Sequence, residues 1–237
     1  MTDQVKNPVS YAEISGMIQK TLGLTGSPVA VKLARSREEI PPGMAEEKEV
    51  LRHCQMVNKA RKESLVFSAT ADKHQCNGGA WALGLREITP TLRSGEFYFK
   101  LGKFESMAAC KRTMEQIPHL RTGETYATLY APLEKAPFTP DVVLIVTSPR
   151  NMLKLAQASL FRLGGRIGSE MAGIQSVCAD ATASPYLSGK ANYSLGCDGS
   201  RKFSGIADDE MVMGIPAELL PELAAALKVV TAAPGSK

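Results

Sequence analysis

The residues best able to do chemistry in this sequence are its five cysteines. They are Cys54, Cys76, Cys110, Cys178 and Cys197. Three of them are followed by residues typical of turns: Asn-Gly-Gly after Cys76, Ala-Asp after Cys178 and Asp-Gly after Cys197. Glycine lets the backbone approach a bound group closely, and turn N–H groups can point at an anionic group. Because a cysteine that packs as a small hydrophobe more often lies within a strand or helix, the three turn cysteines indicate a binding site.

Cys54 and Cys110 lie instead in stretches with helical spacing, where packing is the commoner role for a lone cysteine. The spacing of the cysteines matches neither a zinc ribbon nor a ferredoxin run. Twenty-one residues separate Cys54 from Cys76, and 18 separate Cys178 from Cys197. Ligands this dispersed can converge only through the tertiary structure.

Thiolate ligation suits an iron–sulfur cluster or a structural zinc ion, because both metals prefer soft sulfur donors. Either site needs deprotonated thiols held by positive charge or N–H donors, for which Arg52, Arg166 and Arg201 are candidates. A third alternative is a metal-free thiol enzyme with Cys76 or Cys197 as its nucleophile. No G-x-S-x-G, H-E-x-x-H or phosphate-binding loop motif occurs to suggest other chemistry.

Composition and charge exclude several other classes of protein. The 237 residues are 44% apolar and 22% charged, which is typical of a globular protein. The net charge of +4 is too small and too scattered to indicate a nucleic-acid partner. The apolar run 142–146 is far shorter than the roughly 18–20 residues of a membrane span, and residues 1–6 lack a signal-peptide layout. We therefore expect a cytoplasmic protein whose cysteines form no structural disulfides.

Hydrophobic periodicity predicts a mixed α/β (α+β) fold in a single unit, residues 1–237. Helices are expected over residues 11–22, 46–62, 80–85, 104–117, 151–163 and 221–230. Strands are expected over residues 28–33, 65–69, 96–101, 126–133 and 141–147. Ser10 and Glu13 match a capping box at the first helix, and the continuous apolar run at 141–147 is typical of a strand buried on both faces. Residues 231–237 are expected to form a disordered tail.

A repeated pattern suggests that two similar halves, 11–120 and 121–230, arose by internal duplication. Cys76 lies 22 residues after Cys54, and Cys178 lies 22 residues after Ala156. Both Cys54 and Ala156 are followed by glutamine, and both stretches read as helix, polar break, short strand, cysteine. Chance resemblance is the competing explanation. If the duplication is real, the cysteine corners of the two halves can meet between them.

The chain resembles the ArCR-type family, also called domain of unknown function 169, over roughly residues 11–230. The resemblance rests on Cys54-Gln55, Cys76-x-Gly78-Gly79-Ala80, Pro140-Asp141-Val142, Cys178-Ala179-Asp180, Gly196-Cys197-x-Gly199-Ser200-Arg201 and Gly214-Ile215-Pro216. These blocks contain four cysteines and leave out Cys110, so the resemblance implies one shared site. The family occurs largely in archaea and anaerobic bacteria, a setting that suits an oxygen-sensitive cluster.

The leading hypothesis is an iron–sulfur cluster, most simply a four-iron cubane, that serves electron transfer or a redox step on a small molecule. Its predicted ligands are Cys54, Cys76, Cys178 and Cys197. The predicted cofactor-contacting neighbours are Gly78, Gly79, Gly196, Gly199 and Arg201. A redox protein or a small-molecule substrate is the expected partner, and a homo-oligomer is compatible with the sequence. A structural zinc ion in a binding or regulatory protein and a metal-free thiol enzyme are the alternatives.

Overall fold

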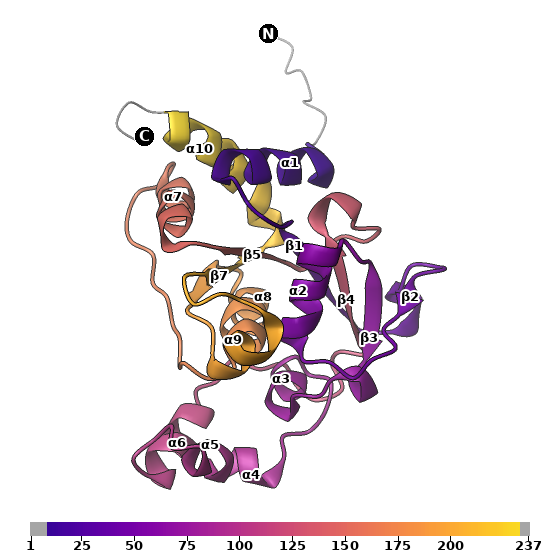
Figure 1. Cartoon of the computed structure of the whole chain (residues 1–237), viewed down its shortest axis with the longest axis vertical. Coiled ribbons are helices and arrows are strands. Elements are labelled where there is room, and N and C mark those ends of the chain that lie inside the picture. The colour runs from indigo at the N-terminus through magenta and orange to yellow at the C-terminus, as the bar shows by residue number, and fades with distance from the viewer. Residues whose placement is uncertain (1–8, 233–237) are drawn as a thin grey trace.

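The computed structural model describes residues 9–232, which form a seven-stranded sheet with helices on both faces (Figure 1). The strands are β1 (Val29–Ala34), β2 (Ala45–Glu46), β3 (Phe67–Thr70), β4 (Ala127–Pro132), β5 (Val142–Thr147), β6 (Asn192–Ser194) and β7 (Met211–Pro216). Their order across the sheet is β2-β3-β4-β1-β5-β7-β6. The β2–β3 pair is parallel and the other neighbours are antiparallel. The predicted mixed α+β class is confirmed.

The interior strand β5 is buried along its whole length, as its apolar sequence predicted. It pairs with β1 on one side and with β7 on the other. Val143 and Ile145 face one hydrophobic cluster, and Val142, Leu144 and Val146 face another. A strand with apolar side chains on both faces requires cover on both faces, and this explains the helical layer on each side.

One face of the sheet is covered by three helices. They are α1 (Tyr11–Leu22), α7 (Pro149–Leu160) and α10 (Leu220–Ala232). The capping box predicted for α1 is present: the Ser10 N–H donates to Glu13 Oε2 at 2.9 Å, and the Glu13 N–H donates to Ser10 Oγ at 3.2 Å. This face consists of ordinary apolar packing and contains none of the cysteines.

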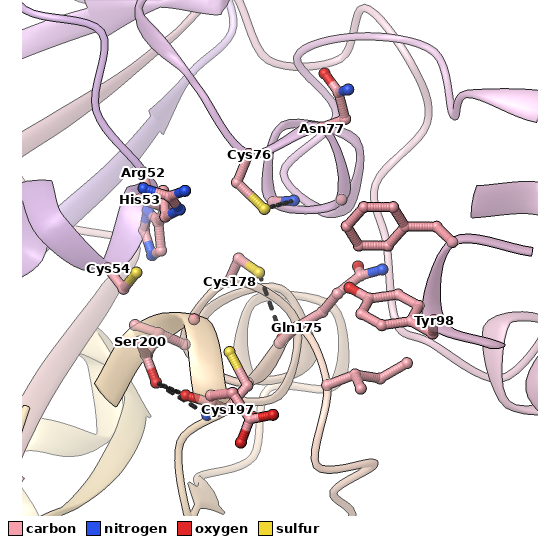
Figure 2. A pocket seen from close by; sticks show the side chains of 18 of the residues that line it. Arg52, His53, Cys54, Cys76, Asn77, Tyr98, Gln175, Cys178, Cys197 and Ser200 are labelled. Atoms are coloured by element: carbon pink, nitrogen blue, oxygen red, sulfur yellow. Dashed lines mark hydrogen bonds between the residues drawn. The ribbon is translucent and has the colours of Figure 1, made fainter. Parts of the chain in front are cut away.

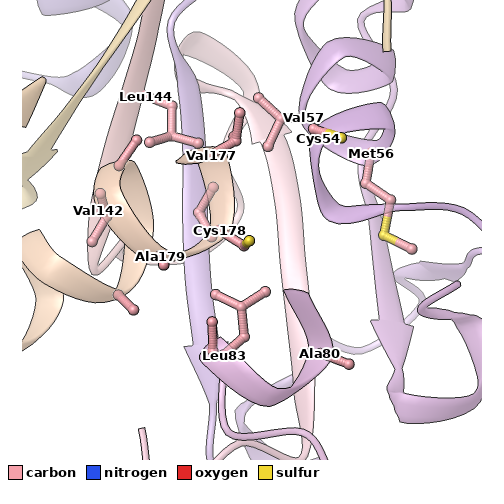
Figure 3. Packing of buried hydrophobic residues seen from close by; sticks show 14 of the residues in the cluster. Cys54, Met56, Val57, Ala80, Leu83, Val142, Leu144, Val177, Cys178 and Ala179 are labelled. Atoms are coloured by element: carbon pink, nitrogen blue, oxygen red, sulfur yellow. The ribbon is translucent and has the colours of Figure 1, made fainter. Parts of the chain in front are cut away.

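The opposite face carries the helices that contain or directly follow Cys54, Cys76, Cys178 and Cys197, together with one further short helix. They are α2 (His53–Glu63), α3 (Asn77–Ala82), the π-helix η4 (Ser176–Ala183), α8 (Ser184–Ser188) and α9 (Asp198–Ser204). Figure 3 shows Cys54 and Cys178 among buried apolar side chains from α2, α3, η4 and β5. This layer therefore both completes the core and places the sulfur atoms.

A small helical group follows α3 in the chain and lies beyond the sheet (Figure 1). It consists of α4 (Pro90–Arg93), α5 (Glu96–Lys100) and α6 (Met107–Met114). The strand predicted over residues 96–101 was wrong, because these residues form α5. Gly95 adopts a left-handed conformation with φ of 84° and directly precedes the helix. Phe97 and Phe99 are exposed, and Tyr98 packs against the hydrophobic core.

Several other element boundaries differ from those predicted. The helix expected over 46–62 begins only at His53, because residues 45–46 form β2 at the sheet edge. Strands β6 and β7 were not predicted. Short 3₁₀ turns complete the chain: η1 (Arg37–Glu39), η2 (Ala71–Lys73), η3 (Leu133–Lys135) and η5 (Ala217–Leu219).

The two predicted halves share one sheet. Strand β4, from the second half, lies between β3 and β1, which both belong to the first. The internal duplication therefore stays a prediction. Thr231 and Ala232 complete α10, and the remainder of the predicted tail, residues 233–237, lies outside the described residues. None of the helices within residues 9–232 is both long and apolar enough to cross a bilayer.

Candidate functional site

Four of the five cysteines line a single cavity of about 640 Å³ (Figure 2). Cys54 lies in the first turn of α2, Cys76 immediately before α3, Cys178 in η4 and Cys197 immediately before α9. The fifth, Cys110 in α6, is fully buried and does not line this cavity. The tertiary structure therefore brings together the same four thiols that the sequence blocks singled out.

Cys76 and Cys178 are neighbours across Gly79. The Gly79 N–H donates a hydrogen bond to Cys76 Sγ at 3.4 Å. A Cβ atom added to Gly79 would lie 3.6 Å from Cys178 Sγ and 3.6 Å from Cys76 Cβ. A larger side chain at residue 79 would therefore stand between the two cysteines. The predicted role of Gly79 as a contact residue of the site is consistent with this position.

Cys178 is held by the unusual backbone of η4. The π-helix starts after Gln175, whose φ of 52° lies in the left-handed region, and Cys178 Sγ donates to the Gln175 carbonyl at 3.3 Å. Thr182 Oγ1 donates to the Val177 carbonyl at 2.8 Å within the same helix. Single-turn π-helices are frequent at functional sites, where they aim side chains that a regular helix would place elsewhere.

His53 connects the segments that bear Cys54 and Cys178. Its Nδ1 lies 2.7 Å from the hydroxyl of Tyr130 in β4, and its Nε2 lies 3.0 Å from Thr182 Oγ1 in η4. Burial lowers the pKa of His53 to about 3, with a smaller contribution from His74. His53 is therefore a neutral, buried cross-link between α2, β4 and η4.

Cys197 lies in a tight loop before α9. Gly196 has a φ of 82°, a conformation that side chains disfavour. The Cys197 N–H donates to Ser200 Oγ at 2.9 Å, and a Cβ at Gly199 would lie 3.8 Å from Cys197 Sγ. Gly196 therefore shapes the loop, while Gly199 lies against the sulfur itself.

The basic residues named from the sequence lie in three different places. Arg52 lines the cavity, Arg166 is exposed and is not a lining residue, and Arg201 also lies outside the lining. The guanidinium of Arg201 donates to the carbonyls of Leu195, Ala207 and Glu210. Arg201 therefore stabilises the backbone on both sides of Cys197 without lining the cavity. The sequence did not single out Lys103 and Lys202, which line the cavity.

Two further residues that line the cavity, Tyr98 and Gln175, were not predicted from the sequence. Tyr98 lay in a segment interpreted as a strand, and Gln175 is not part of any motif. Gly78 lies directly against Gln175, because a Cβ on Gly78 would be 2.9 Å from Gln175 Nε2. Burial raises the pKa of Tyr98, and the thiols of Cys76 and Cys178 raise it further.

The two buried thiols of the cavity, Cys54 and Cys178, have raised pKa values. Burial raises the pKa of Cys54 to about 12, with added repulsion from Cys197 and Cys76. Burial also raises the pKa of Cys178 well above its ordinary value, and the other three thiols act in the same direction. Cys54 and Cys178 are therefore hard to deprotonate unless a cation lies beside them.

The four cavity cysteines do not form a ready-made site for a single ion. Among residues 9–232, no group of three or more His, Cys, Asp or Glu side chains is arranged to hold a single metal ion. The cavity therefore offers four thiol groups, and they are not gathered around a single point as they stand.

Comparisons with known proteins agree with the resemblance seen in the sequence. The model of the family described as "Uncharacterised ArCR", domain of unknown function 169, matches residues 17–226. The chain is 45% identical over 201 residues to the uncharacterized protein MJ0308 of Methanocaldococcus jannaschii, covering 84% of this chain and 86% of that protein. No solved structure is significantly similar. The chain therefore belongs to the ArCR family, domain of unknown function 169.

Proposed function

We propose that the cavity binds an iron–sulfur cluster, most simply a four-iron cluster, through Cys54, Cys76, Cys178 and Cys197. The observation that carries this proposal is that four cysteines from four different helical segments line one cavity, whereas Cys110 does not. Four thiolates are the usual ligand set of such clusters. The cluster supplies one-electron redox chemistry when bound.

The buried thiols of Cys54 and Cys178 would ligate a metal only by giving up their protons to it. The raised pKa values of Cys54 and Cys178 come first from burial and then from neighbouring thiols. A metal core between the sulfurs reverses both effects, because it neutralises the thiolates at close range. The Gly79 N–H on Cys76 Sγ is the kind of donor that stabilises a ligating thiolate.

The size of the site favours a cluster over zinc. Tetrahedral zinc with Zn–S bonds of about 2.3 Å draws its sulfur ligands to about 3.8 Å from one another. The described residues contain no cluster of side chains arranged for one ion. In a four-iron cluster each thiolate binds a different iron, so the sulfur atoms lie farther apart. The cavity of about 640 Å³ also leaves space beside the ligands.

The proposal includes a role and a setting. The cluster would serve electron transfer to a redox partner or a redox step on a small molecule, in the reducing cytoplasm, where the free cysteines persist. One chain supplies all four thiols, so a second copy is not needed to complete the site. The modest net charge of +4 offers no support for a nucleic-acid partner.

The experiment is anaerobic purification of the full chain followed by iron and acid-labile sulfide assays and visible absorption. We expect about four iron and four sulfide per chain, as in a four-iron cluster, with absorption that bleaches on reduction. Single Cys→Ser variants at residues 54, 76, 178 and 197 should each lower the iron content and change the spectrum. Cys110→Ser is the matched control, because Cys110 is buried outside the cavity.

Three outcomes would contradict the proposal. A colourless, iron-free protein under strict anoxia refutes the cluster. Bound zinc without sulfide favours the structural zinc alternative. Equal iron loss in Cys110→Ser and in the four cavity variants would show that iron binding depends only on overall stability.

A second candidate, a metal-free thiol enzyme, is favoured by one observation. Cys76 is only partly buried, so reagents can reach it, and its sulfur accepts a hydrogen bond from the Gly79 N–H. This candidate predicts that iodoacetamide modifies Cys76 much faster than Cys197, which is also partly buried. Equal rates for the two cysteines would exclude it.

A further inference from the structure

The start of η4 places an unpaired polar atom in the wall of the four-cysteine cavity. Gln175 lines this cavity with a relative exposure of only 3%. Its Nε2 donates to Met114 Sδ at 3.6 Å. Its Oε1 is buried and accepts no hydrogen bond from any of the described residues, although the Tyr98 hydroxyl lies beside the amide (Figure 2). A buried amide oxygen without a donor costs stability, so its retention calls for an explanation.

Two backbone features hold this amide in place at the expense of local stability. Gln175 has a φ of 52°, and Ser64 is the only other non-glycine residue among residues 9–232 with a positive φ. Gly78 leaves room for the amide, since a Cβ there would lie 2.9 Å from Gln175 Nε2. Figure 2 shows the Gln175 side chain between Cys178 and Tyr98. Strained residues of this kind cluster at ligand-binding sites.

The rest of the cavity wall is largely apolar. Its apolar lining residues include Leu92, Phe97 and Leu101, from the α4–α5 region, and Ile174. A volume of about 640 Å³ lies within the roughly 300–1,000 Å³ typical of small-molecule sites. The cavity therefore has space and an apolar surface for an organic ligand beside the cysteines.

The charged lining residues are mostly basic. They are Arg52, Lys103, Lys202 and one acid, Asp198. Lys103 pairs with Asp198. The Arg52 guanidinium lies 3.8 Å from the centre of the Phe203 ring and donates to Gln75 at 2.7 Å, with no carboxylate partner among the described residues. The remaining positive charge favours an anionic ligand.

We infer that the cavity binds a small organic acid that carries an apolar body and an O–H or N–H group. That group donates to Gln175 Oε1, the body lies along Leu92, Phe97 and Leu101, and the carboxylate lies toward Arg52. This inference names the class of substrate for the proposed redox site. Any reaction of the acid rests on the proposed iron–sulfur cluster, whereas the binding of the acid does not.

The test uses the anaerobically purified full chain and three matched probes. 3-Phenyllactate carries the apolar body, the hydroxyl and the carboxylate. 3-Phenylpropionate lacks only the hydroxyl, and 3-phenyl-1,2-propanediol replaces the carboxylate with an uncharged alcohol. Binding is measured by ligand-observed NMR and by calorimetry, and the iron content of each sample is determined in parallel. The iron content therefore tests the cluster proposal, and the binding measurements test this inference.

We expect 3-phenyllactate to bind roughly tenfold or more tightly than either analogue, since each lacks one interaction with a buried or charged group. Gln175→Met keeps the length of the side chain and removes the acceptor, so it should abolish the preference for the hydroxyl and leave the iron content unchanged. Met114→Leu is the control, because it alters the partner of Nε2 and leaves Oε1 intact. It should keep the preference.

Either of two results would overturn the inference. One is that the wild-type chain binds none of the probes or binds all three equally, a result that does not depend on the folding of any variant. The other is that Gln175→Met, with normal iron content, still prefers the hydroxy acid. A hydroxyl preference that survives without the amide oxygen would assign the contact to another group.

Discussion

Gly214 of β7 packs directly against the carbonyl group of Ala181 in η4. A Cβ atom on Gly214 would overlap with that carbonyl and would lie 2.9 Å from Pro185 Cγ. The helix that carries Cys178 therefore rests on the sheet at a point where only a hydrogen atom fits. The close approach fixes the depth of η4, and hence of Cys178, relative to the strands.

Gly214→Ala should accordingly be strongly destabilising. The added methyl group meets main-chain atoms that cannot move without displacing η4, and overpacking of this kind costs about 1–3 kcal/mol or more. Urea denaturation followed by circular dichroism measures the loss. Gly16→Ala is the control of opposite sign, because Gly16 lies within α1 with nothing within 4 Å of its added Cβ. It should stabilise the protein by about 0.5–1 kcal/mol, and a comparable loss in both variants would contradict the packing argument.

A buried ion pair joins α2 to the start of β7 and has a predictable pH dependence. Arg61, whose side chain is 2% exposed, forms a bidentate pair with Glu210. Burial is the largest single influence and raises the pKa of Glu210, but the hydrogen bonds from Arg61 and the Ala207 N–H, together with the charges of Arg61 and Lys62, lower the pKa below the usual 4.5. The pair therefore contributes stability above pH 4.5, and this contribution is lost as the pH falls through the lower, folded-state pKa.

Glu210→Gln should remove this contribution at neutral pH and leave Arg61 without a counter-charge, at a cost of about 3 kcal/mol. The difference in unfolding free energy between wild type and variant should shrink when urea melts are repeated well below pH 4.5. Lys100 pairs with Glu96 on the surface of α5, so Glu96→Gln serves as an exposed comparison with an expected loss below 1 kcal/mol. A pH-independent difference for Glu210→Gln would show that the pair is not the cause.

The thiols of the metal-free protein should react in an order set by burial. Cys76 and Cys197 are partly exposed, whereas Cys54 and Cys178 are buried and have raised pKa values. Since the thiolate is the reactive form, iodoacetamide should modify Cys76 and Cys197 first. Peptide mass spectrometry after timed quenching measures the order, and labelling in urea provides the unfolded reference. Early modification of Cys178 would mean that the cavity opens far more than the structure indicates.

The cross-link through His53 should be cooperative. His53→Leu leaves the Tyr130 hydroxyl buried without its histidine partner and should cost about 2–3 kcal/mol. Tyr130→Phe removes that hydroxyl, so the double variant should be less destabilised than the sum of the single variants. A double-mutant cycle from urea denaturation gives the coupling energy between the two residues. Strict additivity would show that the hydrogen bond contributes nothing to stability.

Much of the fold was predictable from local patterns. The capping box at Ser10, the helix that follows it and the buried strand at 142–147 depend on neighbouring residues, so their sequence signals are strong. The prediction of a strand over 96–101 was wrong because the three consecutive aromatic residues 97–99 are also compatible with a short helix when a left-handed glycine precedes it. Strands β6 and β7 lie in glycine-rich or mixed sequence, and their pairing partners are distant in the chain.

The sequence by itself determined which atoms are available: four thiols in distinctive blocks, glycines beside them and a fifth cysteine apart from them. Only the tertiary structure decided that these four thiols share one cavity, that Arg201 lies outside its lining, and that Gln175 and Tyr98 are part of the lining. The reason is physical. Convergence of residues more than a hundred positions apart depends on how helices pack on a sheet, and packing sums many weak contacts that no short stretch of sequence encodes.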